Sequence, residues 1–497
     1  MPDKPDFFYL KTGMKRSDLQ KERPTAKDAI QRRLKQLKSK YPVRSIGRGT
    51  DGELFLTEEE RESHLHILGT TGEGKSRFIE HLIRGDIKQG NGVCFLDPSD
   101  RANTAYRILR YCASIGFDKV CLIDPYRRPL ACIQPFTKYK ASTVANIDST
   151  IRTVFQTKDQ AETTRLNRYL PALLRVLWEA KMTLHESLYF SNFENLYYKA
   201  KRTDILNRLH PFDRDRITIE GVFKSYSRFE TYFSSTVNRL DPFWDSTLSL
   251  MFGADKGIDF RKMITEGWVI LVNLYSGLGF EPLQSRVLGT SIINEVIAAL
   301  DSLWLNHWKG VYYLYVDEAG RYANRNLAEL LAHKRQSGLR VAIAHQYFKQ
   351  FEDPYVLEAI KNLCKLKVMF NTPNHNDRLD MIKALGYGGD IPPLMASYAN
   401  ANLPKQYAVV AVSKQPPVRV KIPNVPDAIV SRAAEADFIQ KCLSHEWNFT
   451  PKEIREQMND RTQAIHPASP HARTVSNRKT TSDTPKTRRK SLLDIKD

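Results

Sequence analysis

The residues most able to do chemistry form one glycine-rich run, Gly69-Thr70-Thr71-Gly72-Glu73-Gly74-Lys75-Ser76, which fits G-x-x-x-x-G-K-[ST] at every position. Glycines let successive backbone N–H groups turn toward an anion, and a following helix adds the positive end of its dipole. Lys75 can then reach the β- and γ-phosphates of a nucleotide, while the Ser76 hydroxyl ligates Mg²⁺. The run therefore predicts a phosphate-binding loop for ATP and Mg²⁺.

A second candidate group follows the apolar run Tyr312–Val316, which ends in Asp317 and Glu318. Two adjacent carboxylates at the end of a buried strand can divide the work of hydrolysis. We expect Asp317 to hold Mg²⁺ and Glu318 to polarise the attacking water.

A third apolar run, Val341–Ala344, is followed by His345 and Gln346. We expect Gln346 to lie beside the γ-phosphate, where a side-chain amide can sense whether the phosphate is present. His345 is interpreted as a structural residue.

Short β-branched runs, each followed by a helical pattern, must position these groups. Strands that alternate with helices predict an α/β fold with a mainly parallel sheet. The expected strands are Leu65–Leu68, Val93–Leu96, Val120–Ile123, Val269–Leu274, Tyr312–Val316, Val341–Ala344, Lys367–Phe370 and Tyr407–Val412.

The pattern divides the chain into five parts. Residues 46–140 and 263–425 form the expected ATPase domain, which is interrupted at 141–262 by a stretch with helical periodicity and no clear strand. Phe223, Tyr226, Phe229 and Phe233 recur there at helical spacing, and core packing is favoured over base stacking. Residues 1–45 read as a basic arm or helix, 426–463 as a helical segment, and 464–497 as a disordered basic tail.

Charge and composition limit the function classes. The 497 residues carry a formal net charge of +19, with 13 basic and 5 acidic residues in 1–45 and 8 and 3 in 464–497. This excess is typical of proteins that meet polyanions. The six cysteines show no metal-binding spacing and are expected to be reduced core residues. Uniformly apolar runs fall short of the roughly 20 residues that span a bilayer, so we expect a cytoplasmic protein with no membrane span.

Three features together resemble the HerA/FtsK superfamily of ring ATPases with a RecA-like domain, and most of all the conjugative coupling proteins of type IV secretion (TraD/TraG-like). They are Ile46-Gly47-Arg48 leading to the phosphate-binding loop, the strand that ends in Asp317-Glu318, and Lys334–Arg340 running into Gln346. The helical stretch at 141–262 is similar to the all-α domain of the coupling proteins. The resemblance covers about 45–425.

The resemblance implies a homo-hexameric ring that hydrolyses ATP at its subunit interfaces and threads DNA through a channel without reading its sequence. It implies that Arg335 enters the neighbouring subunit's site, with Arg340 as a competitor and Arg378 as a second interface arginine. Relaxosome or secretion components, or a nuclease, are the implied partners. Such partners would bring the chain to the inner face of the membrane.

The sequence leaves three alternatives open. One is a HerA-like DNA-processing or defence ATPase that works with a nuclease, and another is a secretion ATPase that acts on protein. The third is a monomeric P-loop kinase or switch, which the helical insertion and the Gln346 strand disfavour.

Overall fold

A computed structural model describes residues 43–49, 52–136, 140–155, 159–244, 246–277, 279–333, 338–387, 391–412 and 417–463. The arm at 1–42 and the tail at 464–497, together with Arg335, lie outside these ranges. The predictions made for them stay predictions.

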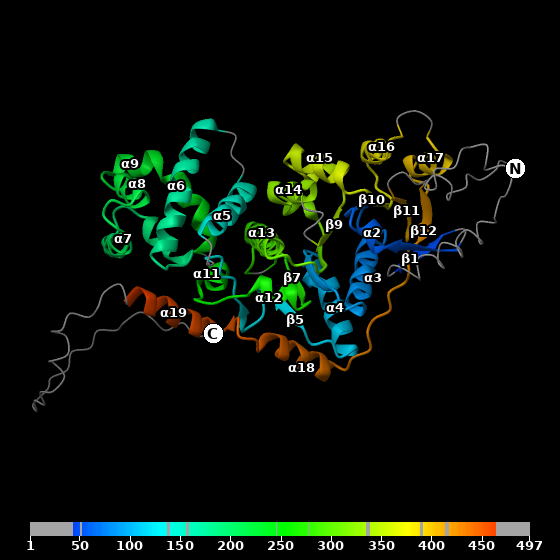
Figure 1. Ribbon diagram of the computed structural model, residues 1–497, viewed down its shortest axis with the longest axis horizontal. Helices are drawn as coiled ribbons and strands as arrows, with labels where there is room; N and C mark the ends of the chain where they lie inside the picture. The colour runs from blue at the N-terminus through cyan, green and yellow to red at the C-terminus, as the bar shows by residue number, and fades with distance from the viewer. Residues whose placement is uncertain are drawn as a thin grey trace, which may run out of the picture.

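The centre of the molecule is one large sheet (Figure 1). Its strands are β1 (Val43–Gly49), β2 (Gly52–Thr57), β3 (Leu65–Leu68), β4 (Gly92–Asp97), β5 (Val120–Ile123), β7 (Val269–Asn273), β8 (Tyr312–Val316), β9 (Leu339–His345), β10 (Leu366–Met369), β11 (Tyr407–Val412) and β12 (Val418–Lys421). They lie in the order β2-β1-β12-β11-β10-β3-β9-β8-β4-β7-β5. The mixed α/β fold with a mostly parallel sheet is confirmed.

The strands from β10 to β5 in this order pair in parallel, and β11, β12, β1 and β2 extend the sheet antiparallel. Every expected run is a strand. The sequence interpretation missed β1, β2 and β12, because strands such as β2 and β12 mix buried positions with partly or fully exposed ones. A strand buried on both faces has a continuous apolar run, which is easier to recognise.

Helices cover both faces of the sheet, as a parallel sheet requires. One face packs on α3 (Lys75–Lys88), α4 (Asn103–Ser114) and α18 (Arg432–Leu443). The other packs on α13 (Pro282–Leu305), α14 (Arg325–His333) and α15 (Pro354–Leu363). Near the ends of β3 and β10, α16 (His375–Ala384) and α17 (Pro393–Ala399) add a small separate core.

One described helix, α13, has the length and apolar composition to cross a membrane. However, 78% of its most apolar window is buried inside the protein. It serves here as the main core helix between the sheet and the helical part of the chain.

The described residues between 140 and 265, called here the all-α unit, contain helices and no strand. They are α5 (Lys140–Val154), α6 (Gln160–Glu179), α7 (Leu196–Asn207), α8 (Arg214–Val222), α9 (Tyr226–Tyr232), α10 (Ser234–Leu240), α11 (Ser246–Gly253) and α12 (Phe260–Thr265). Phe229 and Phe233 are buried and pack against Phe223, which confirms core packing for them, whereas Tyr226 is 54% exposed.

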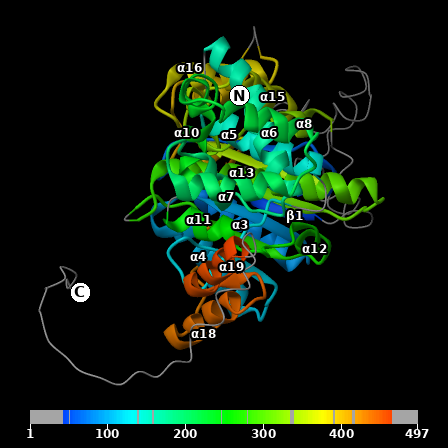
Figure 2. The same ribbon diagram turned by 90° about the vertical axis from the view of Figure 1, so that its left-hand side faces the viewer.

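Residues 418–463, called here the C-terminal strap, run from the sheet to the all-α unit. After β12, α18 packs on β5 and α4, the short strand β13 (Asn448–Phe449) pairs with β6 (Leu130–Ala131), and α19 (Pro451–Gln463) packs on α11. Figures 1 and 2 both place α18 and α19 on the side of the molecule opposite α15 and α16. The strap therefore fastens the two parts of the chain together.

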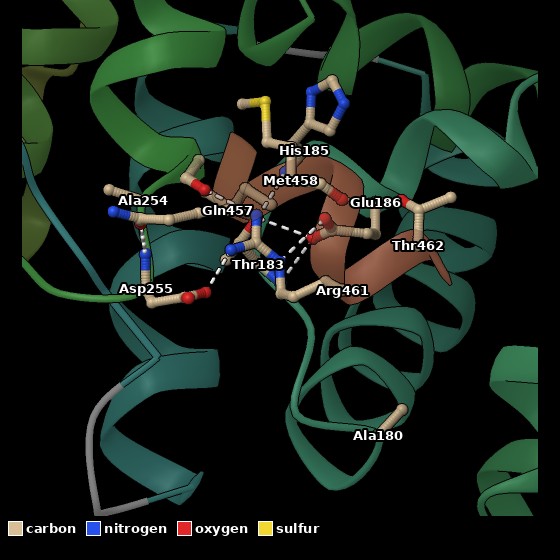
Figure 3. A network of polar contacts seen from close by, with 12 residues as sticks. Ala180, Thr183, His185, Glu186, Ala254, Asp255, Gln457, Met458, Arg461 and Thr462 are labelled. Carbon is tan, nitrogen blue, oxygen red and sulfur yellow. Dashed lines mark hydrogen bonds and ion pairs between the residues drawn. The ribbon is translucent and has the colours of Figure 1, made fainter. Parts of the chain in front are cut away.

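Arg461 fixes the end of the strap (Figure 3). Its Nε donates to the fully buried carboxylate of Glu186 over 3.0 Å, and its Nη2 donates to the Gly253 carbonyl over 2.5 Å. Asp255 is a further ion-pair partner, and Thr183 donates to the second oxygen of Glu186 through both its N–H and its hydroxyl. Every charge in this cluster is thus paired, and the cluster lies between α19 and the all-α unit.

We expect Arg461→Ala to lower the free energy of unfolding by about 3 kcal/mol, because the buried carboxyl group of Glu186 would lose its cationic partner. Urea denaturation followed by tryptophan fluorescence measures the loss. Lys452→Ala is the matched control, since the Lys452 and Glu456 side chains of the same helix are 86% and 60% exposed and should matter little. Equal stability of the Arg461→Ala and Lys452→Ala proteins would contradict the role assigned to Arg461.

Candidate nucleotide-binding site

The candidate site lies at the carboxyl edge of the parallel strands. In the sheet β9 separates β3 from β8, and the pairs Leu68↔His345 and Val316↔Ile343 bring the three strand ends level. The loop after β3, Gln346 after β9, and Asp317 after β8 therefore meet at one place. Parallel pairing creates this meeting, because all carboxyl ends then point the same way.

The phosphate-binding loop has the expected strand–loop–helix setting between β3 and α3. Gly69 must lack a side chain, since a Cβ there would lie 2.5 Å from the Phe370 Cβ. Gly72 and Gly74 have φ values of 87° and 114°, which only glycine adopts readily. The loop is anchored where Gly69 N–H donates to the His345 carbonyl over 3.2 Å.

Lys75 is the first residue of α3, and its amino group points at the carboxylates of Asp317 and Glu318, the two residues that follow β8. Nζ lies 3.3 Å from Asp317 Oδ1 and 3.2 Å from Glu318 Oε1, and the Lys75 side chain is 5% exposed. Lys75 and Glu318 are 243 positions apart in the sequence, yet their side chains belong to one charged cluster. Ser76, half-buried in the first turn of α3, completes the set.

The two carboxyl groups have different pKa values. Burial raises the pKa of Asp317, and the positive charge of Lys75 offsets only part of that rise. Burial would also raise the pKa of Glu318, but Lys75 and the amides of Gln346 and Gln350 outweigh it and lower this pKa. Glu318 is therefore charged at neutral pH and able to accept a proton from water.

Glu318 is held in place by two side-chain amides. Gln346 Nε2 donates to Oε1 over 2.5 Å and Gln350 Nε2 donates to Oε2 over 2.8 Å. The backbone of Glu318 has φ 49°, an uncommon conformation for a residue with a side chain. Gln350 was missed in the sequence, where its only signal is its position one helical turn after Gln346.

Two of the arginines predicted to act at a subunit interface, Arg340 and Arg378, are buried and bound within this chain. Arg340 lies at the amino end of β9, the edge opposite Gln346, where it is 7% exposed and donates to Glu62 over 2.5 Å. Burial lowers its pKa despite Glu62. Arg378 is 6% exposed and donates to carbonyls of its own chain, those of Ala399 and Thr372. Within this chain neither arginine reaches the Lys75 cluster.

The other predicted loop residues take their places in the same turn. Thr70 N–H donates to the Asn371 carbonyl over 3.1 Å, while Thr71 is exposed and Glu73 half-buried.

Beyond the loop, Asp97 at the end of β4 accepts from the N–H groups of Ser99 and Ala105, and burial raises its pKa to about 6. The donor set fits a nucleoside triphosphate with Mg²⁺: a loop of N–H groups, one ammonium, one hydroxyl and one carboxylate.

Residues 312–387, which include β8, β9 and the Glu318–Gln346 contact, match the protein family described as the TraM recognition site of TraD and TraG. The resemblance to the conjugative coupling proteins is confirmed. The match begins at β8, the strand before Asp317, ends just after α16, and lies within the predicted ATPase domain. No curated protein matches the sequence.

Solved structures share the fold over most of the chain. The unbound monoclinic form of the bacterial conjugative coupling protein TrwBdeltaN70 is 16% identical, covers 80% of this chain and 94% of its own, and has a TM-score of 0.55. TrwB in complex with ADP and Mg²⁺ has the same identity and coverage and a TM-score of 0.53. VirB4 of Thermoanaerobacter pseudethanolicus is 16% identical, covers 77% of this chain and 96% of its own, with a TM-score of 0.51.

We expect Gln350→Ala to lower kcat for ATP hydrolysis about tenfold while nucleotide affinity changes little. Glu318 would lose one of two neutral donors, and a hydrogen bond to a charged group contributes about 1.5–3 kcal/mol. Steady-state kinetics and calorimetric titration with a non-hydrolysable ATP analogue separate the two effects. Asn362→Ala is the matched control, since this amide lies on α15 and bonds only to Glu358 among the described side chains. A normal kcat in Gln350→Ala would show that Gln346 alone positions Glu318.

Proposed function

We propose that this chain is an ATP-driven DNA translocase of the conjugative coupling type, which assembles as a hexameric ring and hydrolyses ATP at its subunit interfaces. The observation that carries the proposal is the contact of Lys75 with Asp317 and Glu318, with Gln346 bound to Glu318. The family match at 312–387 and the fold shared with TrwB support the coupling-protein part.

In the proposed mechanism Lys75 exchanges partners. In the structure its amino group contacts Asp317 and Glu318. When a nucleotide binds in the loop, its phosphate oxygens would compete with these carboxylates for the Lys75 ammonium group. When Lys75 turns to the phosphates, Glu318 loses the largest influence that lowers its pKa and becomes a stronger base. Gln346 and Gln350 keep the Glu318 carboxylate aimed while this happens.

Ser76 and Asp317 would hold Mg²⁺, which neutralises charge on the β- and γ-phosphates when bound. Burial raises the pKa of Asp317, and an adjacent divalent cation would lower this pKa and favour the ionised carboxylate that binds it. Arg335 is proposed to supply a further positive charge from the neighbouring subunit. Arg340 is the weaker candidate, since it is buried and paired with Glu62.

The proposed substrate is DNA gripped through its phosphates, with relaxosome or secretion components as protein partners and a location at the inner face of the membrane through them. A TraM-type partner is favoured by the family description of 312–387. The alternatives are a secretion ATPase that acts on protein and a defence or DNA-processing ATPase paired with a nuclease.

Two substitutions should separate binding from chemistry. Lys75→Ala is expected to abolish ATP hydrolysis and weaken nucleotide binding, because the phosphates lose their main cation. Glu318→Gln should bind ATP normally and hydrolyse it at least about 100-fold more slowly. Hydrolysis by Glu318→Gln above a tenth of the wild-type rate would exclude Glu318 as the water-polarising residue.

DNA of any sequence should stimulate the ATPase, and the stimulation should weaken as salt rises. We expect removal of 464–497 to flatten the dependence of DNA affinity on salt without changing the ATPase rate in the absence of DNA. Fluorescence anisotropy with labelled single- and double-stranded DNA over a salt series measures the slope. An unchanged slope would point to a protein-docking role for the tail, and no stimulation by DNA would favour the protein-substrate alternative.

The interface role of Arg335 has its own test. Arg335→Ala should keep ATP affinity and lose most turnover, by up to the 10³–10⁵-fold typical of arginine fingers. Mixing Arg335→Ala with Lys75→Ala subunits should restore activity, because some interfaces then pair an intact loop with an intact arginine. No recovery in rings shown by native mass spectrometry to be mixed would count against a shared site.

A further inference from the structure

A pair of buried histidines joins the two strands that carry the phosphate-binding loop and Gln346. His66 of β3 and His345 of β9 are both 0% exposed. Their Nε2 atoms lie 2.6 Å apart, and the rings stack with centroids 4.9 Å apart and an interplanar angle of 20°. The contact is therefore a direct ring-to-ring hydrogen bond.

The contact between the two Nε2 atoms requires a single proton between them. One Nε2 must carry a hydrogen and donate, and the other must present its lone pair and accept. A second proton would set two N–H groups against each other at 2.6 Å. Burial lowers the pKa of both rings, for His345 to about 3, so the singly protonated contact persists at neutral pH.

The surroundings of the pair are apolar rings with charges beyond them. Phe348 packs on both imidazoles, at 6.0 Å from His66 and 5.2 Å from His345, and Phe351 meets the edge of His345 at 4.9 Å. The nearby charged groups are Lys367 and Lys361 on the side of His66, and Lys75 and Glu318 on the side of His345. Three of these four are cations, which also disfavour a second proton.

The pair is directly connected to the candidate catalytic groups. The carbonyl of His345 accepts from Gly69 N–H, the first residue of the phosphate-binding loop. The next residue is Gln346, whose amide bonds to Glu318 over 2.5 Å. The backbones of β3 and β9 already pair here, with Leu68 opposite His345, and the ring hydrogen bond adds a directional side-chain contact between the two strand ends that two aliphatic side chains would not supply.

We propose that His66 and His345 are positioning residues for ATP hydrolysis, which hold Gln346 and Glu318 at a set distance from the phosphate-binding loop. The proposal rests on the proposed ATPase function. It assigns a role to two residues that neither touch the nucleotide nor belong to the predicted site, and it revises our reading of His345 as merely structural.

The kinetic test uses His66→Leu, His66→Gln and a double-mutant cycle with Gln346→Ala. We expect His66→Leu to lower kcat about tenfold with KM for ATP nearly unchanged, and His66→Gln, which can still hydrogen-bond, to recover most of kcat. In the Gln346→Ala background His66→Leu should cost less than about twofold, since coupled residues are not additive. His185→Leu is the control, because His185 is a half-buried histidine of the all-α unit that hydrogen-bonds to Ser249.

An equal loss from His66→Leu in both backgrounds, or an unchanged kcat in His66→Leu, would overturn the proposal. The first result would make the pair a general stabiliser, and the second would make it irrelevant to hydrolysis. A matching loss in His185→Leu would likewise overturn it, because a histidine in the all-α unit would then have the same effect.

A second readout does not depend on hydrolysis. In protein without nucleotide, labelled with ¹⁵N at histidine and glutamine side chains, NMR should show nitrogen–nitrogen coupling across the ring contact. His66→Leu should abolish the coupling and shift the side-chain amide signal of Gln346, which is assigned by its loss in Gln346→Ala. An unmoved Gln346 signal overturns the positioning role. A wild-type protein without ATPase activity refutes the proposed function, while this readout still tests the pair.

Discussion

The contact of the Lys75 amino group with Asp317 and Glu318 is the interaction on which the rest of the site depends. It joins the helix after β3 to the end of β8, although β9 lies between these strands. Each of the three groups is mostly buried, so the ion pairs of Lys75 with the two carboxylates offset the cost of burying their charges. Parallel pairing across β3, β9 and β8 is what brings them to one edge.

The same cluster leads into the helical half of the molecule. The chain after Glu318 reaches Asn324 and Asn326, whose amides donate to the buried side chain of Asn294 on α13 over 2.8 and 3.1 Å. Asn294 in turn donates to Thr150 of α5 over 2.9 Å. Polar contacts therefore link the segment after Glu318 to α13 and, through Thr150, to the all-α unit.

The C-terminal strap joins the same two parts from the opposite side. Its first strand, β12, lies between β11 and β1 in the antiparallel part of the sheet, and its last helix places Arg461 against the buried carboxylate of Glu186. The sheet and the all-α unit are thus connected twice, once through α13 at the core and once around the outside.

The sequence by itself determined the local chemistry: the phosphate-binding loop, the Asp317-Glu318 strand end, the Gln346 strand and all eight apolar strands. Each of these depends on residues close together in the chain, where glycine spacing and apolar runs leave a direct signal. Only the tertiary structure decided which side chains meet. The order of β3, β9 and β8 placed Gln350 on Glu318 and His66 on His345, and it put Arg340 at the far edge, paired with Glu62. Contacts of this kind join residues separated by up to hundreds of positions, so no local pattern records them, and strand order alone brings them into reach.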